Sequence, residues 1–242
     1  MAQQKKSFLK RFFRRLLKIA LWGFILSVVY TIICIWVFPP VTIMQISNSF
    51  KYGLKRDYVD WKDISYNVKL AAIASEDQSF ADHNGFDWDA MRKSLHPNPK
   101  KKHKKSKIPF GGAASTISQQ TAKNVFLWQG NGYTKYIRKV PEFYFTWLIE
   151  LLWGKKRILE TYLNVIEMGP GIFGIEAASQ KYFHKHAKNL TREETAKIIA
   201  CLPNPKRFSV VPMSVRVSWR YPQILQQMHN IEDDEDISDL LK

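Results

Sequence analysis

The chain has 242 residues, 45% of them hydrophobic, which suits a folded domain of ordinary size and excludes a largely disordered protein. Its formal net charge is +16, but two short segments supply thirteen of these charges. Because the remainder is only mildly basic, no nucleic-acid partner is expected.

The N-terminus carries the first of these basic segments, followed by a long apolar run. Residues 1–18 hold seven basic side chains and no acid, and residues 19–38 hold no charge at all. Twenty helical residues span roughly 30 Å, the hydrocarbon thickness of a bilayer. A cleaved signal peptide would have a shorter apolar region ending in small residues, whereas this run ends in Phe38-Pro39-Pro40. We therefore predict a cytoplasmic tail over 1–18 and a transmembrane anchor over 19–38, with the rest exported.

The two cysteines are placed too differently to form a disulfide framework. Cys34 lies inside the predicted anchor and Cys201 far along the exported part. The exported domain is therefore expected to depend on its hydrophobic core for stability.

Beyond the anchor the sequence divides into three parts. Residues 39–60 have few strong signals and are interpreted as a connector, residues 61–228 as one domain, and the acidic residues 229–242 as a tail. Apolar positions in the domain mostly follow a helical period, so the fold is predicted to be mainly α. Within a long apolar segment, Pro141 predicts a helix boundary or kink.

Several helical segments carry more specific signals. The segment 156–167 places its apolar residues on one face, with Glu160 and Asn164 on another, where they are expected to tie helices together. The sequence from Thr191 to Glu194 has the form of a capping box.

Two other segments are ambiguous by composition. Residues 169–174 match the glycine pattern of dinucleotide-binding proteins, but a helix precedes them and Pro170 lacks an N–H, so a turn is the better interpretation. The six lysines within 100–107 form either a solvated loop or a contact with anionic lipid headgroups.

Two adjacent carboxylates end an apolar helix in an unusual way. Glu76 and Asp77 follow the run 68–74, and Phe80, His83 and Gly85 come at short steps beyond them. A solvated loop has no use for the aromatic ring and a core has none for the carboxylates. The combination suggests the floor of a cleft.

Two further segments place polar and basic groups together. Ser115 can cap a helix on which Thr116, Gln120 and Lys123 share one face. That face suits an anionic ligand or is merely solvated. Downstream, Arg138, Lys139 and Glu142 put two cations within a turn of a carboxylate. Alone, they could be a surface ion pair.

In order and spacing, these segments resemble the peptidoglycan glycosyltransferase family, the lysozyme-like enzymes that polymerise lipid II. The resemblance covers about residues 61–210. It rests on five motifs: Glu76-Asp77-x-x-Phe80-x-x-His83-x-Gly85; Ser115-Thr116-Ile117-Ser118-Gln119-Gln120-x-x-Lys123-Asn124; Arg138-Lys139-x-x-Glu142; Lys156-x-Ile158-Leu159-Glu160-x-Tyr162-Leu163-Asn164; and Leu202-Pro203-Asn204-Pro205. Two departures, Ala113 where the family often has glycine and Pro141 inside the third motif, put local geometry in doubt.

The resemblance implies a lysozyme-like, two-lobed helical domain behind the anchor, without transpeptidase activity. It implies that Glu76 is the catalytic base and that Glu142 is a second catalytic carboxylate. Lys123, Arg138 and Lys139 are implied to hold the diphosphate of the substrate. The remaining implied substrate-site residues shape the site rather than react: Asp77, Phe80, His83, Gly85, Thr116, Gln120 and Asn124.

The resemblance also implies the setting of the reaction. Lipid II would be polymerised into glycan strands for the cell wall, with inversion and release of undecaprenyl diphosphate. A divalent cation, Mg²⁺ or Mn²⁺, could sit between Glu142 and the diphosphate, and no organic cofactor is implied. The expected partners are lipid II, the growing glycan chain and other cell-wall synthesis proteins. The expected location is the inner membrane, with the N-terminus cytoplasmic and the catalytic domain periplasmic.

Two rival interpretations stay open at this point. A lysozyme-like muramidase would share the fold and a catalytic glutamate but would cut glycan with water. A membrane-tethered scaffold would account for the anchor and the basic segments but not for Glu76 and Glu142.

Overall fold

The computed structural model describes residues 2–95 and 115–242. The chain divides into two compact units, Met1–Phe38 and Pro39–Lys242, which are considered separately. The lysine-rich run 100–107 lies outside the described residues, so its two interpretations stay untested.

The first unit is built on one long helix. Helix α1 spans Ala2–Ile33, and its part Lys10–Ile33 is long and apolar enough to cross a membrane. This stretch begins before the predicted span of 19–38 and ends sooner, because the chain leaves the helix after Ile33. The apolar residues 34–38 thus follow the helix instead of extending it.

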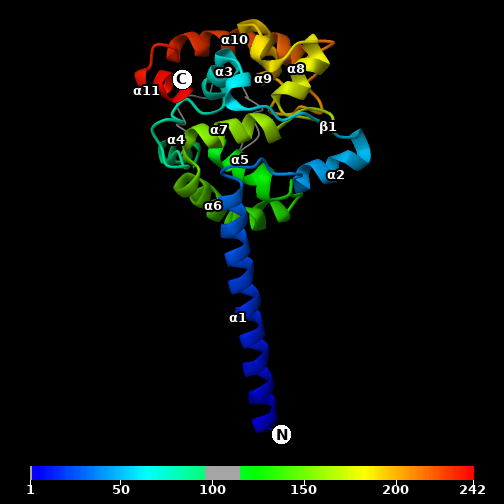
Figure 1. The fold of residues 1–242 in the computed structure, drawn as a ribbon, viewed down its shortest axis with the longest axis vertical. Coiled ribbons are helices and arrows are strands. Elements are labelled where there is room, and N and C mark those ends of the chain that lie inside the picture. The colour runs from blue at the N-terminus through cyan, green and yellow to red at the C-terminus, as the bar shows by residue number, and fades with distance from the viewer. Residues whose placement is uncertain (1, 96–114) are drawn as a thin grey trace. The chain divides into compact units, whose positions relative to one another are not determined.

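The second unit is mainly helical with a small three-stranded sheet (Figure 1). In the sheet, β3 (Ile172–Phe173) lies between the other two strands. It is parallel to β1 (Lys55–Arg56) and antiparallel to β2 (Glu167–Gly169). Its elements in chain order are α2 Ile43–Tyr52, β1 Lys55–Arg56, the 3₁₀-helix η1 Trp61–Asp63, α3 Tyr66–Glu76, α4 Trp88–Leu95, α5 Ile117–Phe126, α6 Thr134–Leu152, α7 Gly154–Val165, β2 Glu167–Gly169, β3 Ile172–Phe173, α8 Ile175–Phe183, the 3₁₀-helix η3 Ala187–Asn189, α9 Arg192–Ile199, α10 Val215–Ile231 and α11 Glu235–Leu241.

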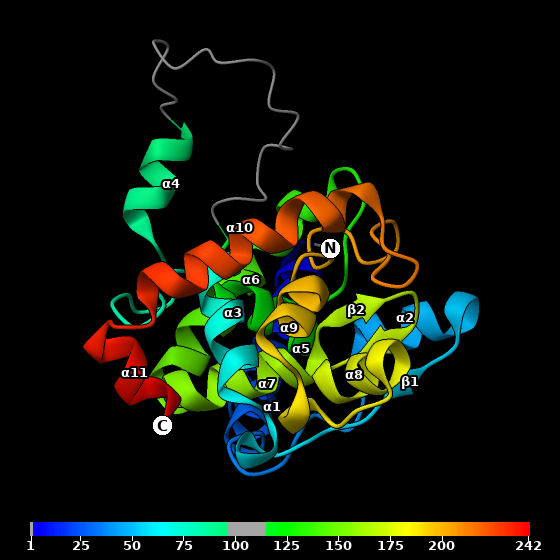
Figure 2. The ribbon, with the colours of Figure 1, turned by 90° about the horizontal axis from the view of Figure 1, so that it is seen from above.

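Helix α3 packs against α9, α10 and α11, and its residues Val68–Ala74 are buried. The last two residues of the helix, Ser75 and Glu76, are partly exposed. Helix α10 crosses α3 and α9 on one side (Figure 2). Helix α5 packs against α6 and α7, and α6 lies on the side of the unit away from α10 (Figure 1). The C-terminal end of α3 is therefore approached by α5 from one direction and by α10 from another.

Three segments differ from the sequence-based expectations. The connector 39–60 contains α2, which begins with a capping box at Thr42. The acidic tail contains α11, whose Ile237 and Leu241 are buried. Helix α6 continues through Pro141, so of the helix boundary or kink expected there the boundary is wrong, and the kink stays a prediction.

Other local expectations are confirmed. Thr191 and Glu194 form the reciprocal hydrogen bonds of a capping box at the start of α9. The turn expected within 169–174 is present at Pro170 and Gly171, but strand β2 directly precedes it where a helix was expected, and it connects β2 to β3. Asn164 bonds both backbone groups of Val59, and Glu160 accepts the N–H of Trp61 at 2.6 Å. These two side chains tie α7 to the segment before α3.

Candidate functional site

Glu76 is the last residue of α3 and is partly exposed. Its two carboxylate oxygens are held from different sides. The Gln120 side-chain amide donates to Oε2 at 3.2 Å, and the Ser75 hydroxyl donates to Oε1 at 3.2 Å. Burial raises the pKa of Glu76, while these two hydrogen bonds and the charges of Arg220 and Lys123 act to lower it. Such opposed influences are typical of a carboxylate that exchanges a proton.

The Gln120 amide has a fixed orientation. Its Nε2 also donates to the carbonyl of Ser115, and its Oε1 accepts a long hydrogen bond of 3.5 Å from the Tyr162 hydroxyl. Tyr162 is fully buried in α7. A buried tyrosine thus directs the amide so that its N–H₂ group faces Glu76.

Lys123 lies one turn further along α5 and is surrounded by charge. Its pKa is lowered to about 8, mainly by burial and also by the positive charges of Arg138 and Lys139, while Glu142 and Glu76 act in the opposite direction. These mutual effects place the three cations and the two carboxylates in one neighbourhood.

Glu142 is buried on α6 and makes two ion pairs. Its Oε2 lies 3.2 Å from Nε of Arg138, and its Oε1 lies 2.5 Å from Nζ of Lys139. Nη1 of Arg138 donates to the carbonyls of Trp128 and Gln129 at 3.0 and 2.6 Å. Arg138 therefore holds the loop before α6, and it is less available to a ligand than the half-exposed Lys139.

The residues around Glu142 do not fit a divalent cation held by the protein. Both oxygens of this carboxylate face cations, with Lys123 nearby. Mg²⁺ and Mn²⁺ prefer several oxygen ligands, and three cations would repel a metal ion. Among the described side chains, no group of three His, Cys, Asp or Glu residues is placed to hold a metal.

The other acidic residue of the first motif has a structural role. Asp77 is buried and accepts the backbone N–H of Ile117 at 2.8 Å, at the start of α5. It also lies 3.0 Å from Nε2 of His83, whose Nδ1 accepts the N–H of Gly85. Because Nδ1 is an acceptor, the proton of a neutral His83 is on Nε2 and points to Asp77. This chain of contacts connects the end of α3 to the start of α5.

Three more predicted site residues are engaged within the fold. Thr116 caps α5 and donates to the carbonyl of Gly85 at 2.7 Å, so the expectation that Ser115 caps this helix is wrong by one residue. Phe80 is fully buried beneath Nζ of Lys155, and Asn124 is buried with its amide donating to the carbonyl of Gln120. These side chains hold the site together rather than face a ligand.

We expect Gly85→Ala to destabilise the protein by about 2–3 kcal/mol. Gly85 has a φ of +88°, and an added Cβ would lie 2.9 Å from side-chain atoms of both Thr146 and Glu150. Denaturant unfolding of the full-length protein in detergent measures this loss. Gly132→Ala is the control, since its φ is +49° but its Cβ would meet nothing within 4 Å. Equal losses in the two variants would show that packing at Gly85 is unimportant.

Sequence reasoning missed three residues at this site: Ser75, Tyr162 and Arg220. Ser75 precedes Glu76 directly, but the sequence does not show that its hydroxyl bonds the carboxylate. Tyr162 lies in the fourth motif, and the sequence does not show that it is near Glu76. Arg220 is 144 positions from Glu76, so no local pattern indicated it. Its Nη2 lies 3.4 Å from the Ser75 hydroxyl.

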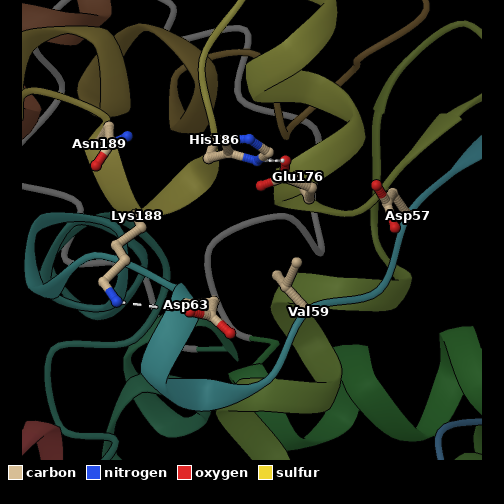
Figure 3. Close-up of a pocket in the computed structure, with 7 residues that line it drawn as sticks. All are labelled: Asp57, Val59, Asp63, Glu176, His186, Lys188 and Asn189. Atoms are coloured by element: carbon tan, nitrogen blue, oxygen red, sulfur yellow. Dashed lines mark hydrogen bonds and ion pairs between the residues drawn. The ribbon is translucent and has the colours of Figure 1, made fainter.

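A separate cavity of about 420 Å³ lies elsewhere on this unit (Figure 3). None of the predicted site residues lines it. Its Glu176 accepts the N–H of Ala187 and pairs with His186, and its Lys188 pairs with Asp63. These carboxylates serve to hold η3 in place.

Comparisons with known proteins agree with this geometry. A family model described as Transglycosylase matches residues 43–229, which include α2 and every residue of the site. The chain is 41% identical to a biosynthetic peptidoglycan transglycosylase of Pseudomonas syringae pv. tomato, covering 92% of this chain and 93% of that protein.

It is also 46% identical to a protein of the same name from Haemophilus influenzae, covering 77% and 72% of the two chains. The expectation of a mainly α, lysozyme-like fold behind an apolar N-terminal helix is confirmed. With a matching family model over most of its length and relatives of this similarity, the chain belongs to the transglycosylase family.

Proposed function

We propose that this protein polymerises lipid II into glycan strands, with Glu76 as the base. The observation that carries the proposal is a carboxylate held through both oxygens beside a cluster of three cations. The relatives named above are called biosynthetic peptidoglycan transglycosylases, which supports the same substrate class.

In this reaction Glu76 takes the proton from the 4-hydroxyl of the acceptor's N-acetylglucosamine. The hydroxyl oxygen forms a bond to C1 of the muramyl sugar at the reducing end of the growing chain. The bond from C1 to the diphosphate oxygen breaks, and undecaprenyl diphosphate leaves with the electron pair. Attack from the opposite face inverts the anomeric centre.

The leaving diphosphate needs charge neutralisation more than it needs a general acid. Lys123 and Lys139 are placed to supply this charge, and Arg138 adds to the field while it holds the loop. An anion bound beside Lys123 would raise its lowered pKa and keep it charged. Glu142 keeps the cations together, since it pairs with two of them.

The site disfavours the two rival functions. A muramidase transfers glycan to water and has no diphosphate to bind, so it has no use for the cation cluster. A scaffold without activity would gain nothing from a partly buried carboxylate, which costs free energy when ionised.

Incubation of the purified full-length protein with labelled lipid II in proteoliposomes separates these functions. We expect polymer to form. Degradation of added glycan would indicate a muramidase, and neither product would indicate a scaffold. Either of those results would overturn the proposal.

The proposed substrates are lipids, and exposed apolar side chains support a membrane-facing surface. On α6 and its N-cap residue Tyr133 they follow one face at helical spacing: Tyr133, Tyr136, Ile137, Val140, Phe143, Trp147 and Leu151. Trp147 is 52% exposed, whereas Trp153, which directly follows α6, is only 7% exposed and belongs to the core.

Helix α2 is unusual because two of its three buried residues are polar, the third being Met44. Gln45 and Asn48 are buried and hydrogen-bonded to Tyr58 and Glu167, while Ile46 and Phe50 face outward. Such an apolar outer face suits the boundary of a bilayer. We propose that the protein lies on the outer leaflet of the inner membrane, with residues 1–18 in the cytoplasm.

A phospholipid with a photoreactive group on its acyl chain should label the peptides of α2 and α6 in nanodiscs. Acyl chains reach side chains that enter the apolar region but not those in water. Mass spectrometry of the digested protein measures the labelling. Helix α11 is the control. If α6 were labelled no more than α11, the membrane-facing surface would be placed wrongly.

A further inference from the structure

Arg220 reaches the surroundings of Glu76 from a different helix than Gln120 and Lys123, which lie on α5. It lies on α10, which packs across α3. Its Nη2 lies 3.4 Å from the Ser75 hydroxyl, which in turn donates to Oε1 of Glu76 at 3.2 Å. Gln223 accepts a hydrogen bond from Nη1 at 3.1 Å, so the guanidinium is held at both ends.

The charged and titratable groups around Glu76 come from every element packed against it. Helix α5 supplies Lys123, helix α10 supplies Arg220, and α7 supplies the Tyr162 hydroxyl. Asp77, directly after α3, and Cys201, after α9, complete the set among the described residues, and both influence the same region. Only two of these groups are cations, and they lie on different elements.

These two cations would be affected differently by substrate. Lys123 belongs to the cluster that faces the diphosphate, so a bound diphosphate offsets the attraction of Lys123 for the Glu76 anion. Arg220 interacts with Ser75 and Gln223 rather than with that cluster. The attraction of Arg220 for the Glu76 anion therefore persists when diphosphate occupies the cation cluster.

We infer that Arg220, acting through Ser75, is a positioning residue that keeps Glu76 an anion while diphosphate is bound. The hydroxyl of Ser75 fixes one carboxylate oxygen, and the guanidinium behind it favours the ionised form. This inference rests on the proposed function, because it assigns a task to the base of that reaction.

Loss of the Arg220 charge should shift the pH below which Glu76 is protonated and cannot act as the base. Without it, burial acts on Glu76 with less opposition and its pKa rises. The ionised fraction at a given pH then falls, so the acid limb of the rate profile moves to higher pH. For Arg220→Gln we expect the rate relative to wild type to be about tenfold lower at about pH 6 than at about pH 8.5.

Initial rates of lipid II polymerisation in proteoliposomes across this pH range test the inference. Arg220→Lys should restore much of the profile, because it returns the charge. Arg216→Gln is the matched control: it removes a cation one turn earlier on α10, where Arg216 stacks on Phe208 and Trp219. We expect it to move the acid limb less than Arg220→Gln does.

Two further measurements distinguish this inference from its premises. Affinity for a diphosphate-containing inhibitor should stay within about twofold of wild type in Arg220→Gln, since the charge acts on the base. The carboxyl ¹³C resonance of Glu76, identified by its loss in Glu76→Gln, should titrate at higher pH in Arg220→Gln, both with and without inhibitor. This readout does not depend on activity.

The possible failures are separable. Equal loss of rate at every pH, an unmoved Glu76 titration, or a large loss of inhibitor affinity would each overturn the role of Arg220. Failure of the wild-type protein to polymerise lipid II would instead overturn the proposed function, whatever the titration showed.

Discussion

Glu76→Gln is expected to abolish polymerisation of lipid II while the fold and the affinity for a diphosphate inhibitor persist. Glutamine keeps the shape of the side chain but cannot accept the proton of the attacking hydroxyl. Turnover of labelled lipid II and inhibitor binding to the same preparation measure the two effects. A variant that retained more than a tenth of wild-type turnover would show that another group is the base.

The stability of this variant gives an independent check. Because burial raises the pKa of Glu76 in the folded protein, its stabilising contribution is complete at low pH and is lost as pH rises through the folded pKa. Above that pKa the charge costs stability, so Glu76→Gln should unfold at the same temperature as wild type or higher. Asp77→Asn is the contrasting variant, since Asp77 accepts the N–H of Ile117 and pairs with His83, and it should unfold at lower temperature.

Lys123→Ala should reduce both polymerisation and inhibitor affinity, by roughly ten- to hundred-fold. A charge-assisted contact of this kind is worth about 1.5–3 kcal/mol. Lys139→Ala should cost less, because the Lys139 side chain is 52% exposed and its charge is screened by water. Inhibitor titrations of the three proteins compare the effects. Wild-type affinity in Lys123→Ala would remove this lysine from the diphosphate site.

The same assignment predicts a pH dependence of binding. Burial lowers the pKa of Lys123 to about 8, so the free protein loses this charge as pH rises above that value. Inhibitor affinity should fall over the same range, since the anion binds the charged form. In Lys123→Arg the affinity should stay level there, because arginine keeps its proton. A wild-type affinity that did not change between about pH 7 and 9 would contradict the assignment.

The sequence by itself determined the helical class, the apolar N-terminal segment and the identity of most of the site. Helical periodicity and capping patterns are local, so they predicted the cap at Thr191 and most of α7, which ends at Val165 and not at residue 167. The motifs around Glu76, Lys123 and Glu142 are local as well, and each could be recognised within about ten residues. Their mutual proximity was expected from the resemblance alone.

Local signals failed where packing overrides them. Helix α6 continues through Pro141, and α2 has an outward-facing apolar surface that its sequence did not distinguish from a connector. The acidic tail forms α11 because Ile237 and Leu241 are buried, and burial of two apolar side chains outweighs the polar composition around them.

Only the tertiary structure decided which side chains surround the carboxylate of Glu76. Asp77 resembled Glu76 in sequence, yet it accepts the N–H of Ile117 and its partner is His83, whereas Glu76 remains partly exposed. Arg220 reaches Ser75 because α10 crosses α3, a contact between positions 145 apart. The pKa of a carboxylate depends on burial and on charges gathered through space, and neither can be read from neighbours along the chain.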